Sequence, residues 1–351
     1  MSTMIRVGLI GVTGYTGMEL VRLLAAHPAM RLSFVASRAE AGKRLGSYYP
    51  FIEKLPGAEL VISKPDMQQA AASCDLVFLA VPHGTAMEMA GALYKLGVPV
   101  VDLSADFRIR DAEVYEHWYA TTHTQKDLIA RAVYGLPELY GDKLPGAKLV
   151  ANPGCYPSAA ILGLYLALKQ TFIQSSDLVI DAKSGTSGAG RKASQATLFC
   201  EIHDSFRAYS LGKHRHTPEI EQELSILAGV PLRLSFNPHI LPVDRGILAT
   251  IYAKLAGPFT LEEIHAAHVE YWKNAPWVRV LPLGVLPETR NVRGTMFCDL
   301  GLVLDPRTDR LIIVSAIDNL CRGASGQALA NANLICGLPV NSGLSNAPLM
   351  P

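Results

Sequence analysis

The chain has 351 residues, of which 32 are Lys or Arg and 31 are Asp or Glu, so its formal charge is +1. This balance gives no overall basic field and argues against nucleic acid as the main partner. Hydrophobic residues make up 49% of the chain, but no apolar run reaches the roughly 18 residues of a membrane-spanning helix. The length predicts about two domains of ~150 residues each. The lack of a signal segment predicts a cytoplasmic protein with no membrane partner.

The first predicted elements are a strand at residues 5–10, a glycine turn at residues 11–17 and a helix. The turn, GVTGYTG, has the GxxGxxG form of a dinucleotide-binding fingerprint. Gly11 permits the tight turn, Gly14 lets backbone amides approach a pyrophosphate, and Gly17 lets the helix lie close to the strand. We therefore predict phosphate binding at the helix N-terminus. The predicted cofactor contacts in this turn are Gly11, Thr13, Gly14, Tyr15, Thr16 and Gly17.

The next predicted strand, residues 32–36, ends in Ser37 and Arg38. Enzymes that prefer NAD usually carry an acidic residue near this point, which binds the ribose 2′-hydroxyl. A hydroxyl and a guanidinium are better suited to a 2′-phosphate, so the sequence predicts NADP(H) as the cofactor. The alternative is that Arg38 is only a surface residue at the end of a strand.

Further strands are predicted within residues 74–84 and 97–108, the first a continuous apolar run typical of a central parallel strand. The loop that contains His83 then lies at the carboxyl edge of the sheet, where open α/β folds bind ligands. At that edge, His83 either contacts the cofactor or makes a structural hydrogen bond.

Six cysteines are spread over the chain without a CxxC pair. This spacing fits neither a zinc site nor a disulfide framework, so we expect no metal and a reducing environment. One thiol differs from the others, because Cys155 lies in a Pro-Gly turn just ahead of a predicted helix at residues 157–168. A helix N-terminus stabilises thiolate over thiol, which indicates a nucleophile at Cys155 rather than a packing residue.

A second glycine-rich loop follows the strand predicted at the start of residues 178–192. It contains Ser187 and Gly188 and is followed at once by Arg191 and Lys192. Small residues, amides and adjacent cations are typical of an anion nest. A flexible loop is the alternative.

Two histidines, His214 and His216, precede a predicted helix with Thr217 as its N-cap and Pro218 as its first residue. The positive end of the helix dipole disfavours imidazolium, so a histidine there stays neutral and can accept a proton. Lys213 and Arg215 flank the pair and are predicted to hold an anionic substrate.

The second half of the chain is predicted to be mainly β, with helices on one side. Strands are expected at residues 246–255, 296–304 and 311–317, with DPRTD as the turn between the last two. Thr260 and Glu263 form a capping box at the start of a helix spanning residues 259–274. We predict an NADP-binding domain at residues 1–152, completed by a C-terminal helix within about 323–351, and a catalytic domain at residues 153–322.

Six motifs taken together resemble the N-acetyl-γ-glutamyl-phosphate reductase family of arginine biosynthesis, type 1. They are, in order, GVTGYTG, NPGCYPS, KSGTSGAGR, HRHTPE, HILPVDRG and DNLCRGASGQALANAN. The resemblance implies an α/β fold with a Rossmann-like NADP-binding domain and an α+β catalytic and dimerisation domain of the semialdehyde dehydrogenase type. It also implies a homotetramer or homodimer. Met296 and Arg322 depart from the commonest family form, which has Asn and Lys there.

The resemblance implies Cys155 as nucleophile, a histidine of the pair as acid/base, and Asn319 near the nicotinamide of NADPH. Ser187 and Gly188 are further predicted cofactor contacts. The predicted substrate contacts are Asn152, Lys213, Arg215 and Arg245. In this mechanism the Cys155 thiolate attacks an acyl phosphate and expels phosphate, and hydride reduces the resulting thioester to a semialdehyde. His216, nearer to the helix, is the predicted proton-transfer residue.

Three alternatives remain from the sequence. Aspartate-semialdehyde dehydrogenase shares the two-domain plan and the thioester route, and a carrier-linked aminoadipyl-phosphate reductase uses nearly the same catalytic set. The third is a non-catalytic NADP-binding sensor, which retention of both glycine loops, the cysteine and the histidines disfavours.

Overall fold

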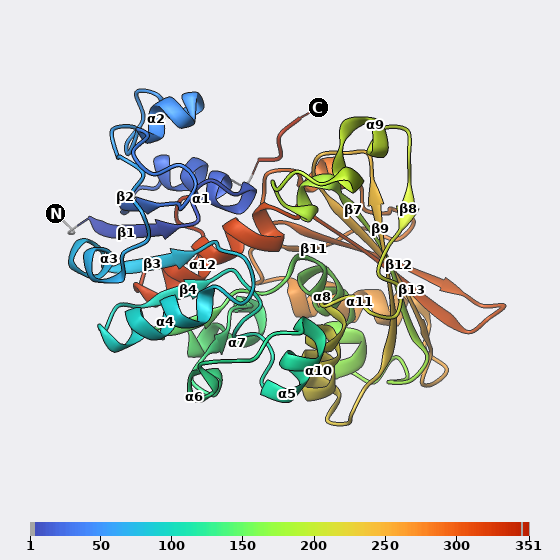
Figure 1. Cartoon of the computed structure of the whole chain (residues 1–351). Helices are drawn as coiled ribbons and strands as arrows, with labels where there is room; N and C mark the ends of the chain where they lie inside the picture. The colour runs from blue at the N-terminus through green and yellow to red at the C-terminus, as the bar shows by residue number, and fades with distance from the viewer. Residues whose placement is uncertain (1–3, 345–346, 351) are drawn as a thin grey trace. The chain divides into compact units, whose positions relative to one another are not determined.

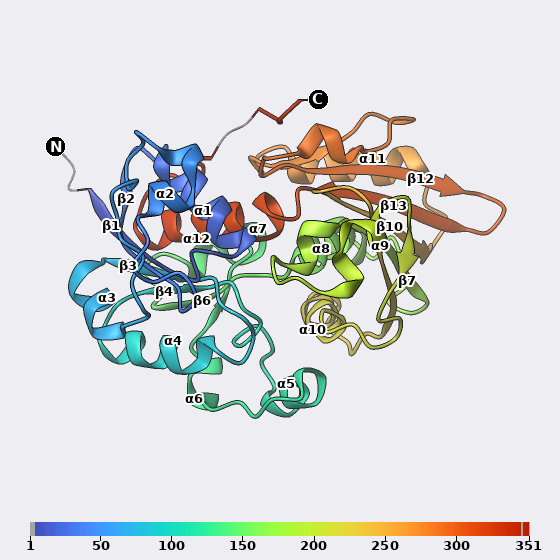
Figure 2. The ribbon, with the colours of Figure 1, turned by 45° about the horizontal axis from the view of Figure 1, so that its top comes forward.

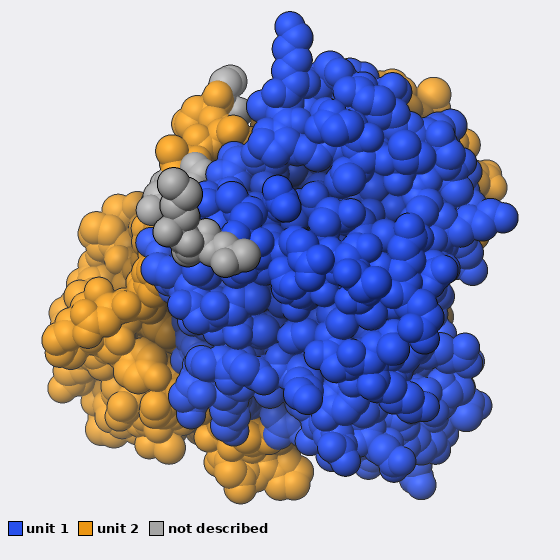
Figure 3. All heavy atoms as spheres, turned by 90° about the vertical axis from the view of Figure 1, so that its left-hand side faces the viewer, with its two compact units in different colours: residues 1–153, 324–344 blue, residues 154–323, 345–351 orange. Residues whose placement is uncertain are grey.

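The computed structural model describes residues 4–344 and 347–350. The chain forms two compact units, one made of Met1–Pro153 with Ala324–Leu344 and the other of Gly154–Gly323 with Ser345–Pro351. Figure 3 colours these units separately. Both units contain helices and strands, as expected for the predicted Rossmann-like domain and α+β domain.

The first unit is built on a parallel sheet with strand order β2-β1-β3-β4-β6-β5 (Figure 1). The strands are β1 Ile5–Ile10, β2 Met30–Ala36, β3 Leu76–Leu79, β4 Val100–Asp102, β5 Val133–Tyr134 and β6 Leu149–Ala151. The order reverses between β1 and β3, which is the switch point where open α/β sheets bind ligands. All four residues of β3 are buried, as predicted for a central strand.

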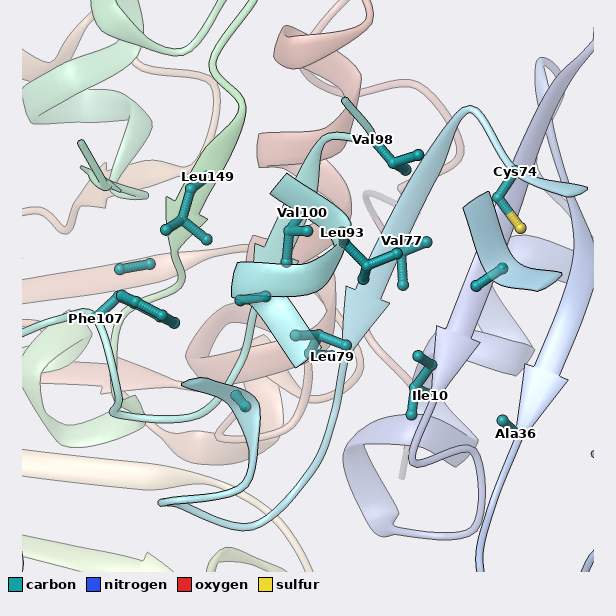
Figure 4. Close-up of a cluster of buried hydrophobic side chains, with 14 of the residues drawn as sticks. Ile10, Ala36, Cys74, Val77, Leu79, Leu93, Val98, Val100, Phe107 and Leu149 are labelled. Atoms are coloured by element: carbon teal, nitrogen blue, oxygen red, sulfur yellow. The ribbon is translucent and has the colours of Figure 1, made fainter. Parts of the chain in front are cut away.

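Helices accompany this sheet along the chain. They are α1 Tyr15–Ala25, α2 Leu45–Tyr48, α3 Met67–Ser73, α4 Ala86–Lys95, α5 Ala112–Tyr119, α6 Lys126–Ile129, α7 Pro137–Tyr140 and α12 Gly326–Ile335. Figure 4 shows the packing of α4 on the strands, where Leu93 meets Val77 and Val100 in one buried cluster. Helix α12 contacts α1 and β4, and the hydroxyl of Ser325 donates a hydrogen bond to the Thr16 carbonyl at 2.8 Å.

The second unit is built on a mixed sheet with strand order β11-β12-β13-β10-β7-β9-β8. The strands are β7 Leu178–Gly185, β8 Arg207–Ala208, β9 Leu234–Leu241, β10 Ile247–Lys254, β11 Val278–Val280, β12 Cys298–Asp305 and β13 Arg310–Ile317. The helices are α8 Cys155–Lys169, α9 Phe199–Ile202, α10 Thr217–Ala228 and α11 Leu261–Trp272. The predicted strands, the β12–β13 turn and the capping box are confirmed.

Helix α8 is buried at every residue from Tyr156 to Leu168. It contacts β10, β12 and β13 on the sheet and α10 and α11 beside it (Figure 2). A helix enclosed on all sides needs no polar face, which explains its continuous apolar sequence. Gly163 allows the close approach, since a Cβ there would lie 3.0 Å from the Ile251 side chain.

Helix starts differ from the sequence prediction by one or two residues. Helix α8 begins at Cys155, not residue 157, so the thiol belongs to the first turn. Helix α10 begins at Thr217, with His216 as its N-cap. The reason is that His216 already has near-helical dihedral angles, φ −80° and ψ −13°. Strand β12 begins at Cys298, which leaves the fully buried Met296 outside it.

The C-terminal segment of the first unit is held by a buried histidine. His27 accepts backbone N–H groups of Ala29 and Met30 at Nδ1, at 3.1 and 2.8 Å. Its Nε2 bonds to Asn333 Oδ1 at 3.1 Å, and the Asn333 amide donates to the carbonyls of Val340 and Ser342. These bonds need neutral His27, and burial lowers the pKa of its imidazole.

We predict that His27 makes the fold sensitive to acid. Because its folded pKa lies below the unfolded value of 6.5, its contribution to stability is present above that value and is lost as the pH falls. Replacing His27 with Gln should flatten the fall in free energy of unfolding between about pH 7.5 and about pH 5.5, measured by urea unfolding. The exposed His117, changed to Gln, is the control, and parallel curves for wild type and H27Q contradict the prediction.

Candidate active site

The glycine turn of the first unit combines two crowded positions with one open position. Gly11 has φ +94°, and a Cβ there would collide with the Ala80 carbonyl. A Cβ on Gly17 would meet the carbonyl of Gly11 and lie 2.7 Å from the Val12 backbone. At Gly14 the nearest atom lies 3.7 Å from an added Cβ, and no side chain caps α1. The α1 N-terminus, including Tyr15 and Thr16, therefore offers its N–H groups to an anion.

The end of β2 supplies a hydroxyl pair and a cation. Thr13 Oγ1 lies 3.0 Å from Oγ of the buried Ser37. Arg38 is exposed, and its guanidinium makes no hydrogen bond or ion pair with residues 4–344 or 347–350. An unpaired guanidinium beside a hydroxyl fits a 2′-phosphate. His83 accepts the N–H of Ala105 at Nδ1, at 3.0 Å, which is the structural hydrogen bond that the sequence left as one of its two options.

In the second unit, Cys155 is the first residue of α8 and follows the extended N-cap Gly154. Its thiol is in no disulfide and is half-buried. Gly323 packs against it, since a Cβ at Gly323 would lie 2.7 Å from the Cys155 Cβ and 3.0 Å from its Cα. The sulfur thus sits at the positive end of a long helix dipole, with its backbone closely confined.

Sequence reasoning missed one residue of this site. Glu219, at the third position of α10, is fully buried, and its Oε1 accepts the Gly154 N–H at 2.8 Å. The available signal was the Glu of HRHTPE, three residues after His216. The pattern pointed to a helix start and gave no indication of a bond 65 residues away.

The two histidines lie together, with ring centroids 5.0 Å apart. His214 Nδ1 accepts the backbone N–H of His216 at 3.1 Å. Three aromatic rings surround His214, with centroid distances of 5.6 Å to Tyr156, 5.5 Å to Tyr209 and 5.2 Å to Phe236. Burial, with the nearby Arg215 charge, lowers the pKa of His214 to about 4. At neutral pH its proton is therefore on Nε2.

The aromatic wall continues to the neighbour of the cysteine. The hydroxyl of Tyr209 donates to that of Tyr156 at 3.1 Å, which in turn donates to the His239 carbonyl at 3.2 Å. Burial raises the pKa of Tyr209 to about 12, so its phenol is neutral at physiological pH. Lys213 and Arg215 extend from this site at exposed positions, and Lys213 Nζ makes no bond within the described parts of the chain.

Three predicted cofactor residues of the second unit meet at one point. Asn319 Nδ2 donates to Ser187 Oγ at 2.9 Å, and an added Cβ at Gly188 would lie 3.7 Å from that nitrogen. Asn319 Oδ1 accepts the Gly246 N–H at 2.7 Å. The glycine-rich loop is therefore joined to the segments around 246 and 319, and is not a free flexible loop.

Arg245 forms a bidentate ion pair with the fully buried Asp318, at 2.8 and 2.9 Å. Asp318 also accepts backbone N–H groups of Gly294, Leu320 and Cys321, at 2.7 to 2.8 Å. One edge of the guanidinium is thus occupied inside the protein. The geometry favours a structural role for Arg245 over the predicted substrate contact.

Asn152, in the first unit, is buried in a network of its own. Its Oδ1 accepts from Asn331 at 3.0 Å, and its Nδ2 donates to the Ala324 carbonyl at 3.1 Å. Both ends of the amide are used, so the structure does not favour the predicted substrate contact here either. Arg322, the other departure from the family pattern, is fully buried in the second unit with its guanidinium 5.8 Å from the Trp277 ring centroid.

Two further features concern metals and membranes. Within residues 4–344 and 347–350, no three His, Cys, Asp or Glu side chains are grouped to hold a metal ion. None of the helices in the described ranges has the length and apolar character needed to cross a membrane.

Both units match known families. Residues 6–147 match "Semialdehyde dehydrogenase, NAD binding domain" and residues 155–319 match "Semialdehyde dehydrogenase, dimerisation domain".

Two curated relatives are named N-acetyl-gamma-glutamyl-phosphate reductase. The relative from Pelotomaculum thermopropionicum is 48% identical over 347 residues, 99% of both chains. That from Syntrophobacter fumaroxidans is 49% identical over 348 residues, 99% of this chain and 100% of the relative. The chain belongs to the N-acetyl-gamma-glutamyl-phosphate reductase family.

Solved structures support the fold of this reductase family member. Aspartate semialdehyde dehydrogenase II from Vibrio cholerae has a TM-score of 0.71 at 15% identity, covering 95% of this chain and 98% of that chain. The Candida albicans aspartate semialdehyde dehydrogenase with NADP has a TM-score of 0.67 at 18% identity, with the same coverage. Such low identity shows a shared fold and nothing of the substrate. The predicted family and fold class are confirmed.

The contact between Gly323 and Cys155 predicts a steric effect on the site. Gly323→Ala should displace the cysteine backbone, and a shift approaching 1 Å lowers kcat by about 10²-fold in well-positioned sites. The control is Gly141→Ala, because nothing lies within 4 Å of a Cβ added there. Steady-state kinetics of the two variants, with melting temperatures to verify folding, measure the effect. Wild-type kcat in G323A contradicts the prediction.

Proposed function

We propose that the protein reduces N-acetyl-L-glutamyl 5-phosphate to N-acetyl-L-glutamate 5-semialdehyde and phosphate, with NADPH as reductant, in arginine biosynthesis. The observation that carries this proposal is a half-buried thiol at a helix N-terminus, in a chain 48% identical over nearly its full length to a reductase of that name. The relatives' name specifies the acyl phosphate, and the thiol supplies the chemistry that such a substrate needs.

The cysteine acts as nucleophile. The Cys155 thiolate attacks the acyl carbon, a carbon–sulfur bond forms, and the bond to the phosphate oxygen breaks, which releases inorganic phosphate and leaves a thioester. The α8 dipole favours the thiolate at this position. After reduction, the thiohemiacetal collapses to the semialdehyde and returns the thiolate.

His216 is the proposed acid/base. His214 has a lowered pKa of about 4, and its Nδ1 accepts the N–H of His216. At neutral pH His214 therefore offers an Nε2–H donor and does not act as the acid/base. His216, at the N-cap of α10, then takes up a proton, for which the Cys155 thiol is one source, gives it to the oxygen that becomes the thiohemiacetal hydroxyl, and removes it again when the intermediate collapses. Lys213 and Arg215, exposed beside the pair, are proposed to hold the anionic groups of the substrate.

The first unit is proposed to bind NADP(H), which supplies the hydride when bound. The open position at Gly14 and the uncapped α1 N-terminus fit a pyrophosphate. The guanidinium of Arg38, which has no partner within residues 4–344 and 347–350, and the hydroxyl pair of Ser37 and Thr13 fit the 2′-phosphate that distinguishes NADP from NAD. In the second unit, Ser187, Gly188 and Asn319 are proposed to contact the nicotinamide end.

The match of residues 155–319 to a dimerisation domain supports a homo-oligomer, a dimer or a tetramer. We place the protein in the cytoplasm, where its small-molecule substrates arise.

The deciding experiment runs the reaction backwards, which avoids the unstable acyl phosphate. Purified protein is given NADP⁺, phosphate and either N-acetylglutamate semialdehyde or aspartate semialdehyde, and NADPH formation is followed. Preference for the acetylated substrate, abolished in Cys155→Ser, is the expected result. Preference for aspartate semialdehyde contradicts the proposed substrate, and activity with neither compound contradicts the proposed reaction. Full activity in C155S contradicts the thioester route.

Substitution of the histidines separates their roles. His216→Ala should lower kcat by about 10²-fold or more, the usual scale for loss of a general acid/base. His214→Gln, which retains an N–H donor, should lower kcat less and leave the pH profile of kcat in place. A larger loss of kcat in H214Q than in H216A reverses the assignment.

The cofactor preference is tested at Arg38. Arg38→Ala should raise the KM for NADPH more than the KM for NADH, because only NADPH carries the phosphate that the guanidinium binds. The ratio of the two KM values in wild type and variant measures this. Equal changes for both cofactors are inconsistent with a 2′-phosphate site at Arg38.

A further inference from the structure

Glu219 joins the two helix starts that carry the proposed chemistry. Its Oε1 accepts the N–H of Gly154 at 2.8 Å, and Gly154 is the N-cap of α8, directly before Cys155. Glu219 itself stands three residues after His216, the N-cap of α10. We propose that Glu219 is a positioning residue that holds the Cys155 turn against the α10 start and takes the Gly154 N–H away from the oxyanion site. This inference rests on the proposed function.

A comparison within the same unit shows how distinctive this bond is. Glu263 occupies the same third position in α11, is exposed, and accepts the N–H of its own N-cap, Thr260, at 2.8 Å. That is the usual capping-box bond. Glu219 is fully buried and directs Oε1 to a residue 65 positions earlier. A position that ordinarily stabilises its own helix here stabilises the start of another.

The energetics favour a specific role for this carboxylate. A buried carboxylate is costly unless hydrogen bonds compensate it, and its bond to a backbone N–H is charge-assisted and strong. The α10 N-terminus stabilises the same charge, since Glu219 lies in the first turn. The Gly154 amide is thus fixed by a rigid partner, and the first turn of α8, including Cys155, is fixed with it.

The bond also limits which groups can stabilise the tetrahedral intermediate. The first N–H groups of a helix have no partners within the helix and are the usual donors to an oxyanion. Because the Gly154 N–H is held by Glu219, the oxyanion on the Cys155 adduct takes its donors from other groups of the first turn or from neighbouring side chains.

The test compares Glu219→Gln with Glu219→Met. Gln keeps an oxygen that accepts the Gly154 N–H, whereas Met fills a similar volume and accepts nothing comparable. We expect E219Q to retain kcat within about three-fold and E219M to lose about 10- to 100-fold, the scale of a misplaced reacting group. The KM for NADP⁺ should be the same in both variants.

The matched control is Glu221→Ala on the same helix. Its Oε1 accepts the Leu234 backbone N–H at 3.1 Å, so E221A removes a similar bond that does not lead to Cys155. We expect E221A to change the melting temperature and leave kcat unchanged. If E221A loses as much kcat as E219M, any disturbance of α10 lowers kcat and the proposal is overturned.

Alkylation keeps this inference separate from the proposed function. The rate at which iodoacetamide modifies Cys155 reports the position of the thiol whatever the substrate is. We expect this rate, measured from pH 6 to pH 9, to change in E219M and to match wild type in E219Q. An unchanged rate in E219M overturns the positioning role. A rate in E219Q that is altered as much as in E219M also overturns it, because the hydrogen bond is then not what holds the thiol in place.

Discussion

The enclosure of α8 is the constraint on which the second unit depends. A helix buried from Tyr156 to Leu168 has little water beside its first turn, so protein groups meet the backbone at its start. Glu219 does so through Gly154, and Gly323 closes the other side of the cysteine backbone. The backbone of Cys155 therefore has a fixed position for the same reason that the domain has a core. The proposed nucleophile stands on the helix whose burial forms that core.

A pair of consecutive residues after β13 organises the loops of the same unit. Asp318 gathers three backbone N–H groups and the Arg245 guanidinium, and Asn319 joins the glycine-rich loop at Ser187 to Gly246. Buried polar networks of this kind specify one arrangement when every member is satisfied. Loops that are distant in sequence are thus held together by hydrogen bonds to these two residues.

The features predicted correctly from the sequence are those with a local cause. The strain at Gly11, the Thr260–Glu263 capping box and the β12–β13 turn each depend on residues within a few positions of one another. The helix start at Cys155 also has a local cause, the turn and the apolar run that adjoin it, whereas the role of Cys155 as nucleophile stays a prediction. The predicted start of α10 was wrong by one residue, because the residue type of His216 does not indicate its near-helical dihedral angles.

The features that the sequence did not predict are contacts between distant segments. The bond from Gly154 to Glu219 spans 65 residues, the Arg245–Asp318 pair spans 73, and the Asn152–Asn331 bond spans 179. Arg245 and Asn152 lie in motifs of the family, and the sequence predicted that both contact the substrate. In the structure each has a partner inside the protein, Asp318 or Asn331, which favours a structural role. An internal hydrogen-bond partner, and not the type of the residue, favours a structural role in both cases.

The first unit is discontinuous, because α12 and the segment anchored by His27 and Asn333 come from the end of the chain. At ~5–20 residues per second, α1 and β4 leave the ribosome about 300 and about 220 residues before the helix that packs on them. For tens of seconds that apolar surface has no native cover, while residues 154–323, a continuous stretch, can complete their own core. A chain that ends before α12 lacks the helix that packs on α1 and β4 of the first unit, and it also lacks the C-terminal residues of the second unit.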